Sequence, residues 1–405
     1  MYLVKDISGA IGLMAAALVL LGTWPVVLAV LERRGRLPQH TYLDYSINNF
    51  LAAVLIALTF GQIGGDTPET PNFLNQLTQH NWPSIMFAMA GGVVITLGTL
   101  ATQYGWAYVG LSVTEVMASS LKVVIGTTLN YFLDGRINRA EVLFPGVGCF
   151  LIAACLGSLV HSSNAADNLE KLSNSKNFTG NTPKEELTRH LLEEEEPKDW
   201  ISSKLANSSR LSCRVLLQKR SYQRKFMFLD PARWWASGLS PSRACATRSL
   251  FTPEFNLATN DQWHTLRDGV PHLVVYTAYF YFSLSSFVVG VALNVWFLYR
   301  PMAGVPRSSL RAYVGDREGR GLALLAGMVS GLGNAFTFMA GQAAGYAAAD
   351  SVQALPLVST FWGVVLFGEY RRSSRRTYTL LGSMLFMFVV AMVVLMASSA
   401  RRKPL

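Results

Sequence analysis

The sequence contains nine stretches of about twenty mostly apolar residues, separated by polar connections. A hydrocarbon core of about 30 Å is crossed by about 20 helical residues. Backbone polar groups inside lipid must be hydrogen-bonded within their own segment, so each stretch should be a helix. We therefore predict an all-α, multi-pass membrane protein. The predicted spans are 7–31, 42–61, 83–106, 110–132, 141–160, 271–299, 321–344, 351–368 and 378–398.

The composition supports a lipid environment. Of the 405 residues, 51% are hydrophobic and 15% are charged, and the net charge is +10. The basic residues lie between the spans, where they orient a membrane protein and contact anionic lipid. No basic stripe is interleaved with aromatic residues, which argues against nucleic acid as a partner.

The basic residues also predict the sidedness of the chain, because Lys and Arg in short loops mark the cytoplasmic face. Arg33, Arg34 and Arg36 follow the first span, whereas the connection at 62–82 has no Lys or Arg. Two further basic connections lie at 300–320 and at 371–376. Nine crossings would place both of these outside. One more crossing between 161 and 270 would return both to the cytoplasm.

We divide the chain into three parts. Residues 1–160 form a first transmembrane half with five helices, and residues 251–405 form a second half with four helices as written. Residues 161–250 are predicted to be a largely disordered cytoplasmic loop, because they are charged and include four consecutive Glu residues.

Within the central loop, residues of about 199–248 are rich in Arg, Ser and Trp and lack an apolar helical period. We hypothesise that this segment is translated in a shifted reading frame. Shifting the frame by one nucleotide converts Trp234 and Trp235 into Val-Gly, and extending the shift with plausible codons gives a membrane-compatible segment. The missing crossing would then be a disrupted sixth helix, which leaves nine spans here.

An internal repeat appears when the chain is shifted by 235 positions. The offset superimposes Gly92 on Gly327, Gly98 on Gly333, Thr102 on Thr337, Glu115 on Asp350, Asp134 on Glu369, and Arg136 on Arg371. Half-units with an odd number of crossings insert in opposite orientations, and such inverted repeats usually enclose a substrate site at their interface. We therefore predict an inverted-repeat helix bundle with five-plus-five architecture.

Glu115 and Asp350 are the leading candidates for chemistry, since each lies near the start of a span. A buried carboxylate in a bundle is costly unless it is paired, protonated or wet, which suggests a role in proton coupling or substrate contact. The alternative is an acid that is favoured by the dipole at a helix amino terminus. Lys122 lies two turns after Glu115 on a similar face, and the alternative for it is a snorkelling lysine.

Amides and aromatic side chains complete the candidate site. Gln103, Asn130, Gln342 and Gln353 can each donate and accept a hydrogen bond, which suits a heterocycle with adjacent carbonyl and N–H groups. Their alternative role is to hold helices together.

Trp362 can stack on a planar ligand or belong to an interfacial belt. Trp24 precedes Pro25, and both Pro25 and Pro356 can open a helix toward a cavity or equally form a plain kink. Asp134 and Glu369 lie beside Arg136 and Arg371, so we interpret them as membrane-edge ion pairs.

No phosphate-binding loop, zinc-protease motif, serine-hydrolase elbow or Cys/His cluster is present in the sequence. We therefore expect neither an enzyme nor a metal or organic cofactor.

Several long strings resemble the plant ureide permease family, among them GLSVTEVMASSLKVVIGTTLNYFLDG and GQAAGYAAADSVQALPLVSTFWGVVLFGEYRRSSRRTYTLL. The resemblance covers about 1–168 and 250–400. It implies a ten-helix fold of the drug/metabolite-transporter type with a large cytoplasmic loop, located in the plasma membrane. It also implies proton-coupled uptake of allantoin and related oxo derivatives of nitrogen heterocycles such as uracil and xanthine.

The chain departs from the family pattern at about 199–248. There the family has a phosphate-loop-like string and the sixth helix, so ATP binding is not carried over. The alternative function is a transport-inactive, truncated isoform that lacks the sixth helix and is retained in the endoplasmic reticulum. Neither the preferred heterocycle nor an oligomeric state follows from the residues.

Overall fold

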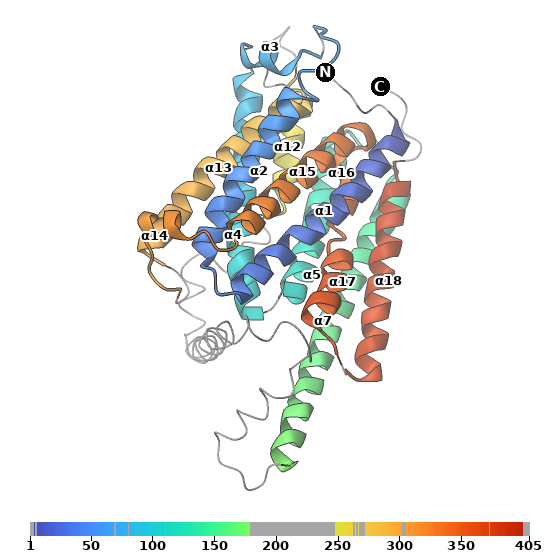
Figure 1. Ribbon diagram of the computed structural model, residues 1–405. Coiled ribbons are helices and arrows are strands. Elements are labelled where there is room, and N and C mark those ends of the chain that lie inside the picture. Colours follow the sequence, from blue (N-terminus) through green and yellow to red (C-terminus); the bar gives the residue numbers. More distant parts are fainter. Residues whose placement is uncertain are drawn as a thin grey trace.

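The computed structural model describes residues 4–178 and 248–399, apart from short gaps at 5, 69, 80, 110, 262–263, 265, 267–271, 302–304 and 372. Every regular element in these residues is helical, which confirms the predicted fold class (Figure 1). Eight described helical segments are long and apolar enough to cross a membrane. They are α1 (Ile7–Arg33), α2 (Pro38–Leu58), α4 (Trp82–Val109), α7 (Ala140–Phe178), α13 (Val275–Tyr299), α15 (Arg320–Ala344), α16 with α17 (Tyr346–Phe367) and α18 (Arg375–Ala397).

The span predicted at 110–132 is an interrupted helix. The chain stays helical throughout, but the α-helical pattern is interrupted by a π-helical turn. The segment consists of α5 (Leu111–Lys122), the π-helix η1 (Val123–Thr127) and α6 (Thr128–Leu133). A π-turn adds a residue to one turn of the helix, and such turns are frequent at functional sites.

The span predicted at 351–368 is also interrupted. After α15 the chain turns at Gly345, whose φ of +89° favours glycine. It continues as α16 (Tyr346–Ala349), the 3₁₀ segment η2 (Asp350–Gln353) and α17 (Pro356–Phe367). Pro356 occupies the first turn of α17, as expected for a residue that ends the preceding segment. Pro25, by contrast, lies inside an unbroken α1, so the predicted opening there is wrong.

The helices pack in a connected series. α1 lies along α15, α15 along α2, α2 along α13, α13 along α4, and α4 along the short helix α12 (Phe251–Asn260). α7 and α18 pack against each other at one edge (Figure 1). Two glycines allow the closest crossings. A Cβ on Gly92 would lie 2.0 Å from the Phe282 carbonyl oxygen, and one on Gly327 would lie 2.1 Å from the Tyr45 carbonyl oxygen.

The helix α7 is longer than the predicted span at 141–160, because it continues to Phe178. The first part of the segment predicted as a disordered loop is therefore helical. The extension is held at its side by α18, since Asp167 accepts hydrogen bonds from the Ser374 backbone N–H at 2.8 Å and the Thr377 hydroxyl at 2.7 Å. The predicted frame-shifted segment at 199–248 lies outside the described residues except for its last residue.

The structure places the connection at 300–320 on the same face as the loop between α1 and α2, because Asp316 contacts Arg36. The short helix α3 (Phe73–Leu77) marks the opposite end of α13 from α14 (Leu310–Gly315) (Figure 1). Five helical segments are described between the loop that follows α1 and the connection at 300–320, namely α2, α4, α5 with α6, α7 and α13.

Candidate functional site

The two interrupted helices face each other in the bundle and exchange a polar contact at their breaks. Lys122, the last residue of α5, donates a hydrogen bond from Nζ to Oε1 of Gln353 in η2 at 2.7 Å. Both side chains are buried. A buried ammonium group needs such an acceptor, because it has lost its hydration. The contact therefore joins a cation and an amide half-way along the helical run from α5 to α6.

Asp350 lies beside this pair, against the π-helix. Its Oδ2 accepts hydrogen bonds from Asn130 Nδ2 at 3.1 Å and from the Thr127 hydroxyl at 3.3 Å. A Cβ on Gly126 would lie only 3.2 Å from the same oxygen, so the carboxylate rests on the η1 backbone. The π-turn thus brings a hydroxyl and a bare backbone position to one carboxylate.

A chain of amides continues from Asp350 to a second acid. Asn256 of α12 donates from Nδ2 to Asn130 Oδ1 at 3.2 Å and to Asp134 Oδ1 at 2.8 Å. The other oxygen of Asp134 accepts from the Ala347 backbone N–H at 3.3 Å. All of these side chains are buried. Two carboxylates are therefore connected by two asparagines, and we call Lys122, Gln353, Asp350, Asn130, Asn256 and Asp134 the polar network.

This arrangement suits neutral polar ligands and protons. Each asparagine presents a donor and an acceptor on one planar group, so it can exchange its partner for a ligand group of matching shape. The two carboxylates offer places for a proton within the buried network. The described residues include no group of His, Cys, Asp and Glu that could hold a metal ion.

Four of the residues expected from sequence meet in the polar network, namely Lys122, Asn130, Asp350 and Gln353. Glu115 is buried on α5, about two helical turns before Lys122. Gln342 is partly buried near the end of α15, and the side chain of Gln103 lies outside the described residues.

The two tryptophans pack elsewhere. Trp24 on α1 lies 5.2 Å from Tyr45, measured between ring centroids. Trp362 on α17 donates to the Thr23 hydroxyl at 3.2 Å, which connects α17 to α1. Neither contact joins the polar network.

Sequence reasoning missed part of the network. Asn256 was not considered, because it lies outside the nine predicted spans. Asp134 was interpreted as half of a membrane-edge ion pair with Arg136, whereas it is buried and bonded to Asn256 and Ala347, so that interpretation is incomplete. The guanidinium of Arg136 lies over the Phe132 ring, 5.6 Å from its centroid. The sequence did contain one signal that Asp134 is special, because the offset of 235 positions pairs it with another acid, Glu369.

Comparison with known proteins identifies the family. The ureide permease family profile matches residues 41–398. The chain is 59% identical to ureide permease 1 of Arabidopsis thaliana over 406 residues, covering 100% of both chains. It is 59% identical to ureide permease 2 of the same plant, also over 100% of both. It is 54% identical to probable ureide permease A3 of Vigna unguiculata, over 93% of this chain and 100% of that one. The chain therefore belongs to the ureide permease family, a family of multi-pass membrane transporters and not of enzymes.

Proposed function

We propose that this protein carries cyclic ureides such as allantoin, and related oxo-heterocycles such as uracil and xanthine, together with protons across the plasma membrane. The names of its relatives supply the substrate class. The observation that supports the mechanism is the polar network, in which Asp350 is buried against uncharged donors.

The chemistry of these substrates matches the network. Their rings carry adjacent N–H and carbonyl groups, and an asparagine side chain pairs with such an edge through one donor and one acceptor. Asn130 and Asn256 present amides of this kind, and the Lys122 ammonium can donate to a ring carbonyl in place of Gln353. A bound ligand would thus replace hydrogen bonds that the side chains already make with one another. Few polar groups would be left unpaired, so the net cost in free energy would be small.

Proton coupling is proposed for Asp350. The partners that the structure gives its carboxylate are amide and hydroxyl groups. A carboxylate in such surroundings is expensive while charged, and a proton removes that cost. A substrate that replaces one of its donors changes the balance between the charged and neutral forms. Binding of substrate and of proton would then depend on each other.

We also propose that the two halves are inverted repeats. Gly92 brings α4 against α13 in the same way that Gly327 brings α15 against α2. The hydroxyl of Thr102 donates to the Gly98 carbonyl, and the hydroxyl of Thr337 donates to the Gly333 carbonyl. These matched contacts fall on residues that the offset of 235 positions pairs.

The test is uptake of radiolabelled allantoin and uracil by cells that express the chain, at acid and neutral external pH. We expect faster uptake at acid pH, and Asp350→Asn should remove the pH dependence. Glu318→Gln is the matched control, since Glu318 is exposed on the connection at 300–320. Surface-expressed protein without uptake at either pH would contradict the proposal. It would favour the transport-inactive isoform, as would retention in the endoplasmic reticulum.

A further inference from the structure

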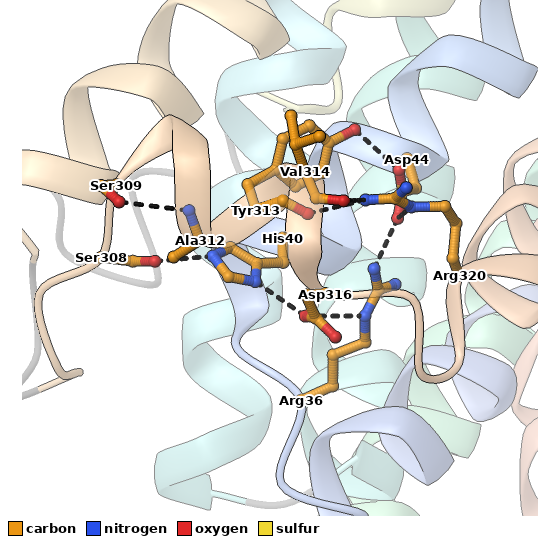
Figure 2. Close-up of polar contacts among 10 residues, drawn as sticks. All are labelled: Arg36, His40, Asp44, Ser308, Ser309, Ala312, Tyr313, Val314, Asp316 and Arg320. Atoms are coloured by element: carbon orange, nitrogen blue, oxygen red, sulfur yellow. Dashed lines mark hydrogen bonds and ion pairs between the residues drawn. The ribbon is translucent and has the colours of Figure 1, made fainter.

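The amino-terminal turns of α2 carry a buried row of charged side chains. His40 and Asp44 lie one turn apart on the same face of α2, and Arg36 lies in the loop just before this helix. All three are buried. They face the connection between α13 and α15, which contains α14 (Figure 2). These charged side chains therefore connect the start of α2 to a loop from the other half of the chain.

Asp316 binds two of these side chains. It accepts from His40 Nδ1 at 2.7 Å and from Arg36 Nε at 3.4 Å (Figure 2). The other ring nitrogen of His40 bonds the Ser308 hydroxyl at 2.7 Å. One histidine thus holds both ends of the short connection.

Asp44 binds the remaining groups. It pairs with Arg36 at 2.6 Å and lies 3.5 Å from Arg320 Nε, and it accepts from the Tyr313 hydroxyl at 2.7 Å. Burial and the nearby Asp44 carboxylate raise the pKa of Tyr313 to about 12. The Tyr313 phenol therefore stays protonated and remains a donor at cellular pH. We call Arg36, His40, Asp44, Ser308, Tyr313, Asp316 and Arg320 the ionic latch.

A smaller contact of the same design lies at the opposite end of α13. Gln76 on α3 donates from Nε2 to the His272 carbonyl at 2.8 Å, and its Oε1 accepts from the Val274 N–H at 2.9 Å. We call these three residues the amide clasp. In each case a short helix in the connection after one helix holds the start of a helix from the other half. The offset of 235 positions pairs the start of α2 with the start of α13, and 73–77 with 308–312.

The hydrogen bonding of the ionic latch is incomplete, unlike that expected of a contact that never opens. Arg36 Nη1 is buried without a hydrogen-bond partner, and Arg320 Nε meets the Asp44 carboxylate only as a long ion pair of 3.5 Å. Buried charges lose their hydration, and that loss offsets much of their mutual attraction. Water would restore the hydration when the contact separates. Separating a contact made of such groups therefore costs little net free energy. Separating a contact between apolar side chains costs more, because it exposes apolar surface to water.

We propose that the ionic latch and the amide clasp are the two gates of this transporter, on opposite faces of the membrane. Opening one end of the bundle requires the latch to separate, and opening the other end requires the clasp to separate. The latch has more hydrogen bonds than the clasp, and several of them involve charged groups, so at rest the latch holds its face more firmly than the clasp does. The resting protein then opens preferentially at the α3 face. This inference rests on the proposed transport function.

The test uses cysteine reporters beneath each gate, in a background where the four native cysteines are replaced by serine. Thr41→Cys follows His40 in the latch, and Thr277→Cys lies one turn beyond Val274 in the clasp. Both threonines are fully buried, and neither hydroxyl has a hydrogen-bond partner, so both replacements are mild. Labelling by methanethiosulfonate ethylammonium in permeabilised membranes reports whether water reaches each position.

Asp316→Asn should raise labelling of the Thr41→Cys reporter about tenfold and lower that of Thr277→Cys, because it removes the negative charge that pairs with Arg36. Gln76→Leu should do the reverse, and the double variant should lie between the two. Ser308→Ala removes only one bond of His40, so it should act as Asp316→Asn does but more weakly. Glu318→Gln, on the exposed surface of the same connection, should change neither reporter.

Opposite responses of the two reporters are the result that supports paired gates. If Asp316→Asn and Ser308→Ala raise both reporters together, the contacts are simple structural supports and the proposal is wrong. If neither reporter changes, the ends do not open at these contacts, and the proposal is wrong as well. Labelling needs no substrate, so opposite responses in a protein without ureide uptake would contradict only the proposed substrate.

Discussion

Replacing Asn130 by leucine is the sharpest perturbation of the polar network, because this side chain joins three others. Its Nδ2 lies 3.1 Å from Asp350 Oδ2 and 3.1 Å from the Thr252 hydroxyl, and its Oδ1 accepts from Asn256 at 3.2 Å. Leucine is similar in volume but has no polar atom. Each buried group that loses its partner costs about 1–3 kcal/mol. Asp350 keeps the Thr127 hydroxyl and Asn256 keeps Asp134, so we expect a total loss of about 2–4 kcal/mol.

The assay is thermal unfolding of the purified protein in detergent, together with uptake. Thr128→Val is the matched control, because the Thr128 hydroxyl bonds the Val124 carbonyl within its own helix at 2.6 Å. Asn130→Leu should lower the unfolding midpoint well below that of the control and abolish uptake at both pH values. If the two variants unfold at the same temperature and both transport normally, Asn130 is not the centre of a coupled network.

The remaining predictions concern topology and packing. A glycosylation acceptor inserted after Arg311 should stay unmodified in microsomes, and one inserted after Pro68 should be modified, because these connections lie on opposite faces. Modification after Arg311 would reverse the assigned sidedness. Gly92→Ala and Gly327→Ala should each destabilise the bundle by about 1–3 kcal/mol, since the added methyl group meets backbone carbonyls. Gly12→Ala, with no atom within 4 Å of the new methyl group, should be neutral in the same unfolding assay.

The helical fold could be predicted because the length of an apolar run and the thickness of a membrane are physically related. The interruptions within helices were harder. Pro356 indicated the break after η2, because proline restricts the backbone in a known way. The turn at Gly345 was not predicted, although its positive φ favours glycine. The π-turn at Val123–Thr127 contains Gly126 but no proline, and a single glycine inside an apolar span does not specify a π-turn, so its position could not be predicted.

Asp134 was the main source of error among the acids at the ends of spans. It lies near Arg136 in the sequence, so it resembles a charge that anchors a helix at the membrane surface. The structure buries Asp134 and bonds it to Asn256 of the other half of the chain. This partner lies more than 100 positions away in the sequence, and such a contact leaves no local pattern.

The polar network is not symmetric between the two proposed repeats. On the proposed repeat, Lys122 corresponds to Leu357, and Asn130 corresponds to Val365. The fold needs only the shared small residues that allow the helices to cross, and these are kept in both halves. The ammonium and the central amide occur in the first half alone, and they bond η2 of the second half. Such a site suits a ligand whose two edges carry different polar groups. A fully symmetric site would offer the same groups to both edges of the ligand.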